Sequence, residues 1–180
     1  MKNQKKINRN NRKRGGAFEK RVADLLDMDV VPYSGSNSRY GYGDVRDTVW
    51  LGECKNITPK NNNVTLQMKW FNKNIERARN IKHTPFLAWM PAGKPDKYII
   101  LEDIDMFGEY DNSIVVDLYR PNATNLIINI NDDYMMSVKK GHIVKLTLHG
   151  RCWYMMNIMK FREYIYKYNK KGDRQTDGLC

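Results

Sequence analysis

The order of hydrophobic patterns in the first half of the chain most limits the folds open to it. Residues 44–47 and 49–55 are short β-like segments separated by a polar turn, which predicts a hairpin. Apolar residues then recur at helical spacing over 64–82, and two further apolar runs follow at 86–90 and 98–101. Strands, a helix and more strands in this order predict an α/β fold, with a mixed sheet flanked by helices.

Both ends of the chain extend this pattern. An apolar face formed by Phe18, Val22 and Leu25 predicts a first helix over 15–28, and another helix is expected over 157–169. Short strands are expected at 114–118, 126–130 and 143–148. The predicted organisation is a basic flexible arm at 1–14, a core at 15–110, a C-terminal extension packed on the core at 111–170 and a flexible tail at 171–180.

Charge points to an anionic partner. The formal net charge is +11, and residues 1–14 contain seven Lys or Arg residues but no Asp or Glu. A surplus of this kind favours nucleic acid, and we expect the arm to neutralise phosphates, with Lys13 and Arg14 nearest the first helix. The alternative is a solvated tail that only improves solubility.

Cysteine usage indicates a reducing cytoplasm, and the small, lysine- and asparagine-rich character of the chain favours that of a prokaryotic or phage-infected cell. Cys54, Cys152 and Cys180 are odd in number, widely spaced and without a CxxC pair, which argues against a disulfide scaffold. His149 and Cys152 have no second pair of ligands at zinc-finger spacing. No apolar run approaches the length of a membrane span, so no membrane association is expected.

The chemistry is expected on the hairpin. Glu53 and Lys55 are two residues apart on a predicted strand and therefore point to the same face, where Asp44 on the preceding strand can approach them. Paired carboxylates bind a hard cation such as Mg²⁺, and the backbone carbonyl of Cys54 is a further candidate ligand. A lysine beside such an ion can orient water or stabilise charge on a phosphate. The alternative is an ordinary salt bridge on a hairpin surface, with Glu19 as a solvated helix residue.

The chain also resembles a known group of enzymes. Gly16-Ala-Phe-Glu19, Ser34-Gly-Ser, Gly43-Asp44-Val and Glu53-Cys-Lys55 are similar, in order and context, to the motifs of the PD-(D/E)xK nucleases. The likeness is greatest to archaeal Holliday junction resolvases and their phage relatives, and it covers about residues 15–90. It implies a restriction-endonuclease-like fold and a homodimer that cuts two DNA strands and leaves 5′-phosphates.

Carried over by position, the resemblance assigns roles to individual residues. Asp44 and Glu53 would bind Mg²⁺ or Mn²⁺ directly, Glu19 would complete the metal shell through water, and Lys55 would be the catalytic lysine. Gln67 is expected one turn into the helix after the Glu-x-Lys strand, which makes it a catalytic candidate; the alternative is an exposed helix residue. The candidate DNA-binding residues outside the arm are Ser36, Ser38, Arg39 and Lys69.

The function expected from these observations is Mg²⁺-dependent cleavage of DNA, selective for branched DNA such as a junction. One alternative is a nuclease with the same chemistry that acts on duplex or single-stranded DNA. A second is a basic DNA-binding protein without catalysis. The aromatic residues between 134 and 168 are expected mainly in the core, although stacking on bases or a dimer interface is an alternative for them.

Overall fold

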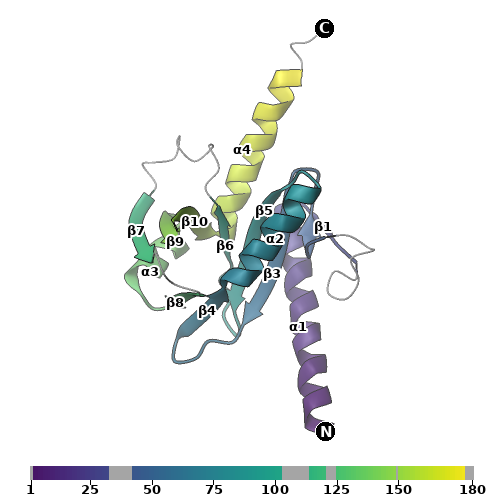
Figure 1. The fold of residues 1–180 in the computed structure, drawn as a ribbon, viewed down its shortest axis with the longest axis vertical. Helices are drawn as coiled ribbons and strands as arrows, with labels where there is room; N and C mark the ends of the chain where they lie inside the picture. The colour runs from purple at the N-terminus through teal and green to yellow at the C-terminus, as the bar shows by residue number, and fades with distance from the viewer. Residues whose placement is uncertain (1, 33–41, 103–113, 121–124, 149, 177–180) are drawn as a thin grey trace.

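The computed structural model describes residues 2–32, 42–102, 114–120, 125–148 and 150–176. It shows an α/β protein with a mixed sheet in the strand order β1-β2-β3-β5-β6-β10-β9-β7 and a separate pair formed by β4 and β8 (Figure 1). The helices are α1 Lys2–Leu26, α2 Met68–Asn80, α3 Asp133–Lys139 and α4 Ile158–Thr176. The strands are β1 Asp29–Val30, β2 Val45–Arg46, β3 Trp50–Ile57, β4 Asn63–Gln67, β5 Thr84–Pro91, β6 Tyr98–Glu102, β7 Ile114–Arg120, β8 Asn125–Asn129, β9 Ile143–Leu148 and β10 Arg151–Asn157.

The sheet separates two apolar cores. One contains the inner faces of α1 and α4, where the Trp50 ring meets that of Phe161 edge-on with centroids 5.2 Å apart. The other contains α2, α3 and the β4–β8 pair, and there Phe71 packs against Trp153 at 4.9 Å. Aromatic residues of the C-terminal part thus lie in both cores, as expected, whereas Tyr166 is exposed. Both faces of the sheet are covered by helices, as the hydrophobic pattern predicted.

The predicted hairpin is confirmed. β2 and β3 are antiparallel with Val45 opposite Gly52, and the Asp47 carboxylate accepts hydrogen bonds from the backbone N–H groups of Val49 (2.7 Å) and Trp50 (2.6 Å). A glycine is required at position 52, where β3 lies between β2 and β5, because a Cβ there would overlap the side chains of Phe86 and Val45. β3 also pairs with β5, which runs parallel to it and contains the strand predicted at 86–90.

The prediction of one helix over 64–82 is wrong at its start. Residues Asn63–Gln67 form β4, which pairs antiparallel with β8, and α2 begins only at Met68. Val64 and Leu66 are fully buried and alternate with more exposed residues, as a half-buried strand requires. Pairing with β8, distant in sequence, therefore decides the conformation of this segment.

The first helix is longer than predicted. α1 begins at Lys2 rather than near residue 15, and Gly15 and Gly16 do not interrupt it. Lys and Arg, which make up half of residues 1–14, are good helix formers. In Figure 1 the N-terminal half of α1 projects beyond the sheet. The flexibility of residues 1–14 and their role in binding phosphates stay predictions.

Three strands of the C-terminal part, β7, β9 and β10, continue the main sheet, whereas β8 pairs with β4 in the small sheet. The expected strands β7, β8 and β9 are present, and β10 pairs with β6 so that Tyr154 lies opposite Leu101. α3 and β10 were not predicted, because α3 is a single short helix and the apolar run of β10 is buried on both faces and has no period. α4 begins as expected but continues to Thr176, into the segment predicted as a tail.

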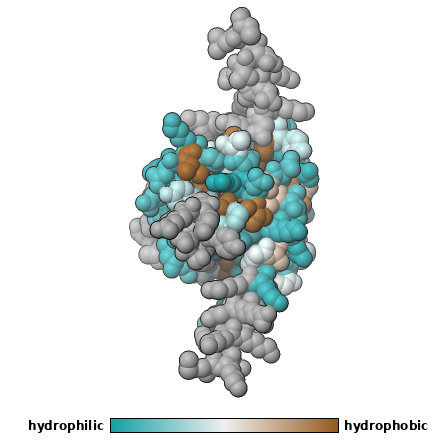
Figure 2. Space-filling view, turned by 90° about the vertical axis from the view of Figure 1, so that its right-hand side faces the viewer, coloured by the Kyte–Doolittle hydropathy of each residue, from teal (hydrophilic) through white to brown (hydrophobic). Residues whose placement is uncertain are grey.

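On the face shown in Figure 2, the described residues are mainly hydrophilic, with scattered apolar residues. The large exposed apolar side chains are spread over four elements: Val30 on β1, Ile127 on β8, Met136 on α3, and Met159 and Tyr166 on α4. Scattered residues of this kind are normal on a protein surface. Within the described ranges, no helix has the length and hydropathy needed to cross a membrane.

Candidate functional site

The site is built where β3 continues past its neighbour β2. The last pair between the two strands is Val45 with Gly52. Asp44, the residue just before β2, donates its backbone N–H to the Gly52 carbonyl at 2.8 Å. The Asp44 carboxylate then accepts a hydrogen bond of 2.8 Å from the backbone N–H of Cys54. The Asp44 side chain thus accepts from the N–H of Cys54, which no backbone carbonyl of β2 reaches. This hydrogen bond fixes the buried Asp44 beside β3, which carries Glu53 and Lys55.

Lys55 connects the three groups expected as metal ligands. Its Nζ donates to Glu53 Oε1 at 2.5 Å and to the Cys54 carbonyl at 3.1 Å, and it lies 3.9 Å from Asp44 Oδ2. These side chains are mostly shielded from solvent, with exposed fractions between 12% and 24%. Two carboxylates and a carbonyl therefore converge on one positive charge.

Glu19 faces this cluster from α1. Burial and the nearby Asp44 carboxylate raise the pKa of Glu19, while Lys55 lowers it and Glu53 raises it. A Cβ on Gly15, one turn earlier, would lie 3.7 Å from Glu19 Oε1, an ordinary van der Waals contact that leaves the carboxylate in place. The structure thus brings Glu19, Asp44, Glu53 and Lys55 together; the spacing predicted the last three, and the resemblance implied Glu19.

The Cys54 side chain lies on the other side of β3. It is buried in the core shared by α1 and α4, and burial raises the pKa of its thiol far above the usual value. A neutral thiol in that core packs as a small apolar group. Only the backbone carbonyl of Cys54 is available to the site, as expected.

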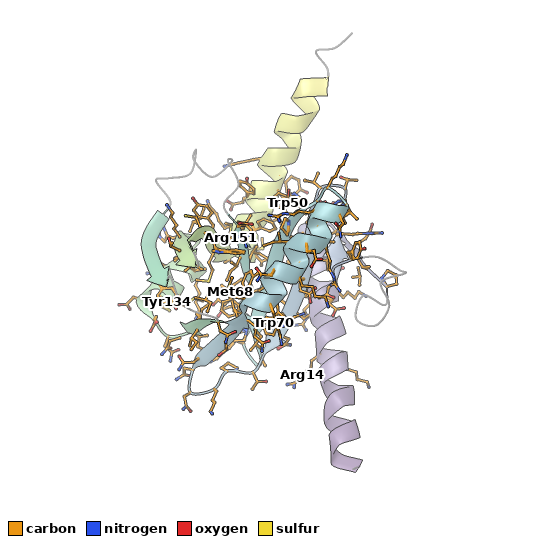
Figure 3. The ribbon with its side chains drawn as sticks, viewed as in Figure 1. Arg14, Trp50, Met68, Trp70, Tyr134 and Arg151 are labelled. Atoms are coloured by element: carbon orange, nitrogen blue, oxygen red, sulfur yellow. The ribbon has the colours of Figure 1, made fainter. Side chains whose placement is uncertain are left out.

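Two residues of α2 contact the site and were not identified from the sequence. Arg77 Nη1 lies 3.5 Å from Glu53 Oε2, and the Lys55 ammonium lies 5.7 Å from the centre of the Trp70 ring. Figure 3 shows Trp70 projecting from α2. The two residues are seven positions apart, which places them on one face of a helix. This spacing was a usable signal, but it did not show that the face meets β3.

The other candidates are placed less favourably or lie outside the described residues. Gln67 is the last residue of β4 and the N-cap of α2, so its expected position one turn into the helix is wrong. No hydrogen bond or ion pair joins Gln67 to Asp44, Glu53 or Lys55 in the part of the chain that the structure describes. Lys69 is exposed in the first turn of α2.

The candidate DNA-binding residues on α1 precede Glu19. Lys13 and Arg14 are exposed, and Figure 3 shows Arg14 on the part of α1 that projects from the sheet. The expected loop residues Ser36, Ser38 and Arg39 lie outside the described residues.

The donor groups fit a hard divalent cation, although they are not arranged as a ready metal site. Among the described residues, no three His, Cys, Asp or Glu side chains are grouped so that they could hold an ion as they stand. Lys55 explains this, because its ammonium lies between the oxygens of Asp44 and Glu53. Carboxylate and carbonyl oxygens are the ligands that Mg²⁺ and Mn²⁺ prefer, so the chemistry of the set is suitable once Lys55 moves aside.

Comparisons with known proteins add no family or function to this geometry. No protein-family model, no curated protein and no solved structure matches the chain.

Proposed function

We propose that the protein is a Mg²⁺-dependent DNA endonuclease of the PD-(D/E)xK type, with a restriction-endonuclease-like core. The observation that carries the proposal is the convergence of Asp44, Glu53 and the Cys54 carbonyl on the Lys55 ammonium. Oxygen ligands that already surround a cation suit a metal ion, and Lys55 would remain close by for the reaction.

Each residue has a defined task in this proposal. Asp44 and Glu53 would hold the ion with the Cys54 carbonyl, and Glu19 would bind one of its water molecules. A bound Mg²⁺ would supply charge to polarise the scissile phosphate and would lower the pKa of the attacking water. Lys55 would orient that water or stabilise the negative charge that develops on the phosphate oxygens.

The substrate is proposed to be branched DNA, such as a four-way junction, cut by a homodimer. Support for this part comes from the order of the sequence motifs and from the net charge of +11, which favours a polyanion. Lys13, Arg14 and Lys69, all exposed, are proposed to contact DNA phosphates. Ser36, Ser38 and Arg39 keep the same proposed role on sequence grounds.

Cleavage assays with matched variants test the chemistry. Lys55→Met and Asp44→Asn should each reduce Mg²⁺-dependent cleavage by about a hundredfold or more, since each removes charge that stabilises the transition state. Lys60→Met, at an exposed lysine nearby, should cut at the wild-type rate. DNA binding by all three variants should persist in a filter or gel-shift assay. If Lys55→Met or Asp44→Asn cuts normally, the site assignment is wrong.

Matched four-way, flap and linear DNA substrates test the substrate class. Faster cutting of the four-way junction is expected, and equal rates on all three would leave a nuclease without structural selectivity. Absence of cleavage with any substrate and either Mg²⁺ or Mn²⁺, together with intact DNA binding, would favour a basic DNA-binding protein instead.

A further inference from the structure

Glu53 interacts with two cations through different oxygen atoms. Lys55, which also lies 3.9 Å from Asp44 Oδ2, binds Oε1, whereas Arg77 of α2 lies 3.5 Å from Oε2. Lys55 belongs to the motif on β3, but Arg77 comes from α2, 24 residues after Glu53 in the sequence. The two oxygens of one carboxylate therefore have separate partners, and the partner of Oε1 is the lysine that also approaches Asp44.

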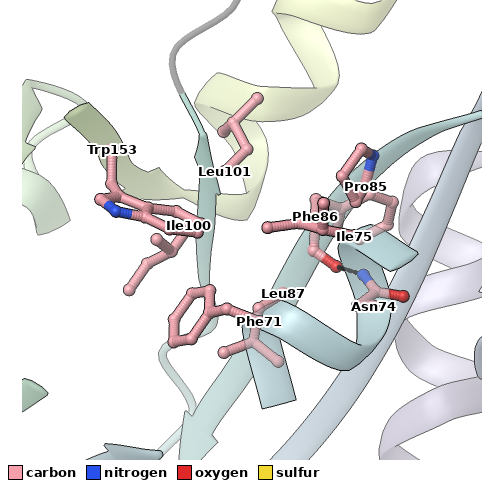
Figure 4. A pocket seen from close by; sticks show the side chains of 9 residues that line it. All are labelled: Phe71, Asn74, Ile75, Pro85, Phe86, Leu87, Ile100, Leu101 and Trp153. Carbon is pink, nitrogen blue, oxygen red and sulfur yellow. Dashed lines mark hydrogen bonds between the residues drawn. The ribbon is translucent and has the colours of Figure 1, made fainter. Parts of the chain in front are cut away.

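The helix that carries Arg77 is held to the sheet by a buried side chain one turn before Arg77. Asn74 is 3% exposed, and its side-chain N–H groups donate to the backbone carbonyls of Leu51 (3.2 Å) and Phe86 (2.8 Å). Figure 4 shows Asn74 directed from α2 to the carbonyl of Phe86. Leu51 is two residues before Glu53 on β3, so Asn74 fixes α2 to the strand that carries the carboxylate. Ala78, next to Arg77, is fully buried and keeps the helix close to the sheet.

We propose that Arg77 is a positioning residue for Glu53: it holds Oε2 and so orients Oε1 as a single-oxygen ligand for the divalent ion. This inference rests on the proposed function, since it concerns the same metal site. A glutamate has several rotatable bonds, and restricting them before binding lowers the entropy lost when the ion is bound. Arg77 also carries positive charge, which by itself opposes a cation. The two effects have opposite signs, so measurement can separate them.

The test measures Mn²⁺ binding to the full chain without DNA. Either isothermal titration calorimetry or the electron paramagnetic resonance signal of free Mn²⁺ gives the Kd. If positioning dominates, Arg77→Met should raise the Kd for Mn²⁺ about tenfold, the scale expected from releasing a glutamate side chain. Arg77→Lys keeps the charge but lacks the planar guanidinium, and its Kd should lie between those of the wild type and Arg77→Met. Arg79→Met, which removes the same charge from an exposed position on α2, is the matched control and should leave the Kd unchanged.

Each outcome decides the inference. An unchanged Kd in a folded Arg77→Met variant overturns it, and a lower Kd shows that Arg77 acts as a competing charge. If the wild-type protein binds no Mn²⁺, the metal site and the proposed function are both wrong. If the wild type binds Mn²⁺ and Arg77→Met binds it equally well, only the inference about Arg77 is wrong. In cleavage assays, Arg77→Met should raise the Mg²⁺ concentration needed for half-maximal rate more than it lowers the rate at saturating Mg²⁺. Circular dichroism and thermal melting establish that the variants are folded.

Discussion

Strands β3 and β10 lie in the same sheet, but their side chains meet different conditions. β10 has partners on both sides: Trp153, for example, lies opposite Glu102 of β6 and Leu146 of β9. Its residues from Trp153 to Met156 are buried and apolar. In the described residues, β3 has partners on both sides only as far as Gly52, and beyond that point it pairs only with β5. Glu53 and Lys55 lie in this second stretch.

The difference shows how a sheet can hold a charged site without placing charge in its apolar core. Where β2 ends, the Asp44 carboxylate takes over one hydrogen bond of the strand, to the N–H of Cys54. The resulting edge admits Lys55 and leaves it about a quarter exposed. A buried charge is costly unless it is paired and hydrogen-bonded. Here Glu53 accepts a hydrogen bond from Lys55, and Asp44 accepts one from the N–H of Cys54.

The largest expected effect on stability lies in β10. Trp153→Ala should lower the free energy of unfolding by about 3–5 kcal/mol, because the ring is almost fully buried against Phe71 and its removal leaves a cavity. Urea unfolding followed by circular dichroism measures this. Tyr166→Ala, at an exposed aromatic of α4, is the control and should change stability by about 0.5 kcal/mol or less. Equal effects of the two variants would contradict the assignment of Trp153 to the core.

Substitutions at Asp44 should separate its structural and chemical roles. Asp44→Ala leaves the buried N–H of Cys54 without its acceptor and should cost about 1–3 kcal/mol. Asp44→Asn keeps an amide oxygen that can accept this hydrogen bond, so its loss of stability should be smaller. Both should abolish cleavage. Equal destabilisation by the two variants in urea would show that the hydrogen bond to Cys54 is not what fixes Asp44.

Glu19 should make stability depend on pH in a defined direction. Its pKa is raised in the folded protein, chiefly by burial and then by Asp44, so the folded state binds a proton more tightly than the unfolded state. Stability is therefore lost as pH rises from the ordinary glutamate value of 4.5 through the raised pKa. Glu19→Gln should melt at a higher temperature than the wild type at pH 7 in EDTA, and this difference should disappear near pH 4.

Addition of Mg²⁺ supplies the contrast for Glu19. The ion should raise the melting temperature of the wild type more than that of Glu19→Gln, because the ion compensates a carboxylate that the variant lacks. A Glu19→Gln variant that melts with the wild type at both pH values would show that Glu19 is solvated and lies apart from the cluster.

The smallest effect is expected at an ion pair at the start of β10. Arg151 pairs with Glu102 across β6 and β10, with side chains about one third exposed, and it also lies over the Trp153 ring. Arg151→Met should cost about 1 kcal/mol or less, and cleavage should not change, because this pair has no role in the proposed site. Loss of cleavage in this variant would mean that the region around Arg151 is coupled to the site on β3.

The sequence predicted the parts of the site that depend on neighbouring residues. Alternation along one strand placed Glu53 and Lys55 on the same face, and the short turn after Asp47 brought Asp44 to them. The order of the central strands and the start of α4 were also predictable from hydrophobic patterns. The function and the family stay proposals.

The remaining features depend on contacts between distant segments. Val64 and Leu66 also fit the helical pattern of the residues after them, and only pairing with β8 makes them a strand. Arg77 fits an exposed position of an amphipathic helix, and its contact with Glu53 arises only when Asn74 anchors α2 on β3 and β5. Gln67 was misplaced for the same reason as β4, since the start of α2 is set by that pairing.

Anomalous scattering from crystals soaked in Mn²⁺ tests the central claim most directly. The account predicts one peak bound by Asp44, Glu53 and the Cys54 carbonyl, with the Lys55 ammonium moved away from the 2.5 Å contact that it makes with Glu53. The same soak of Asp44→Asn crystals should give no peak at this place. A wild-type map without a peak there, or a peak held by other residues while Lys55 keeps its contact with Glu53, would contradict the account.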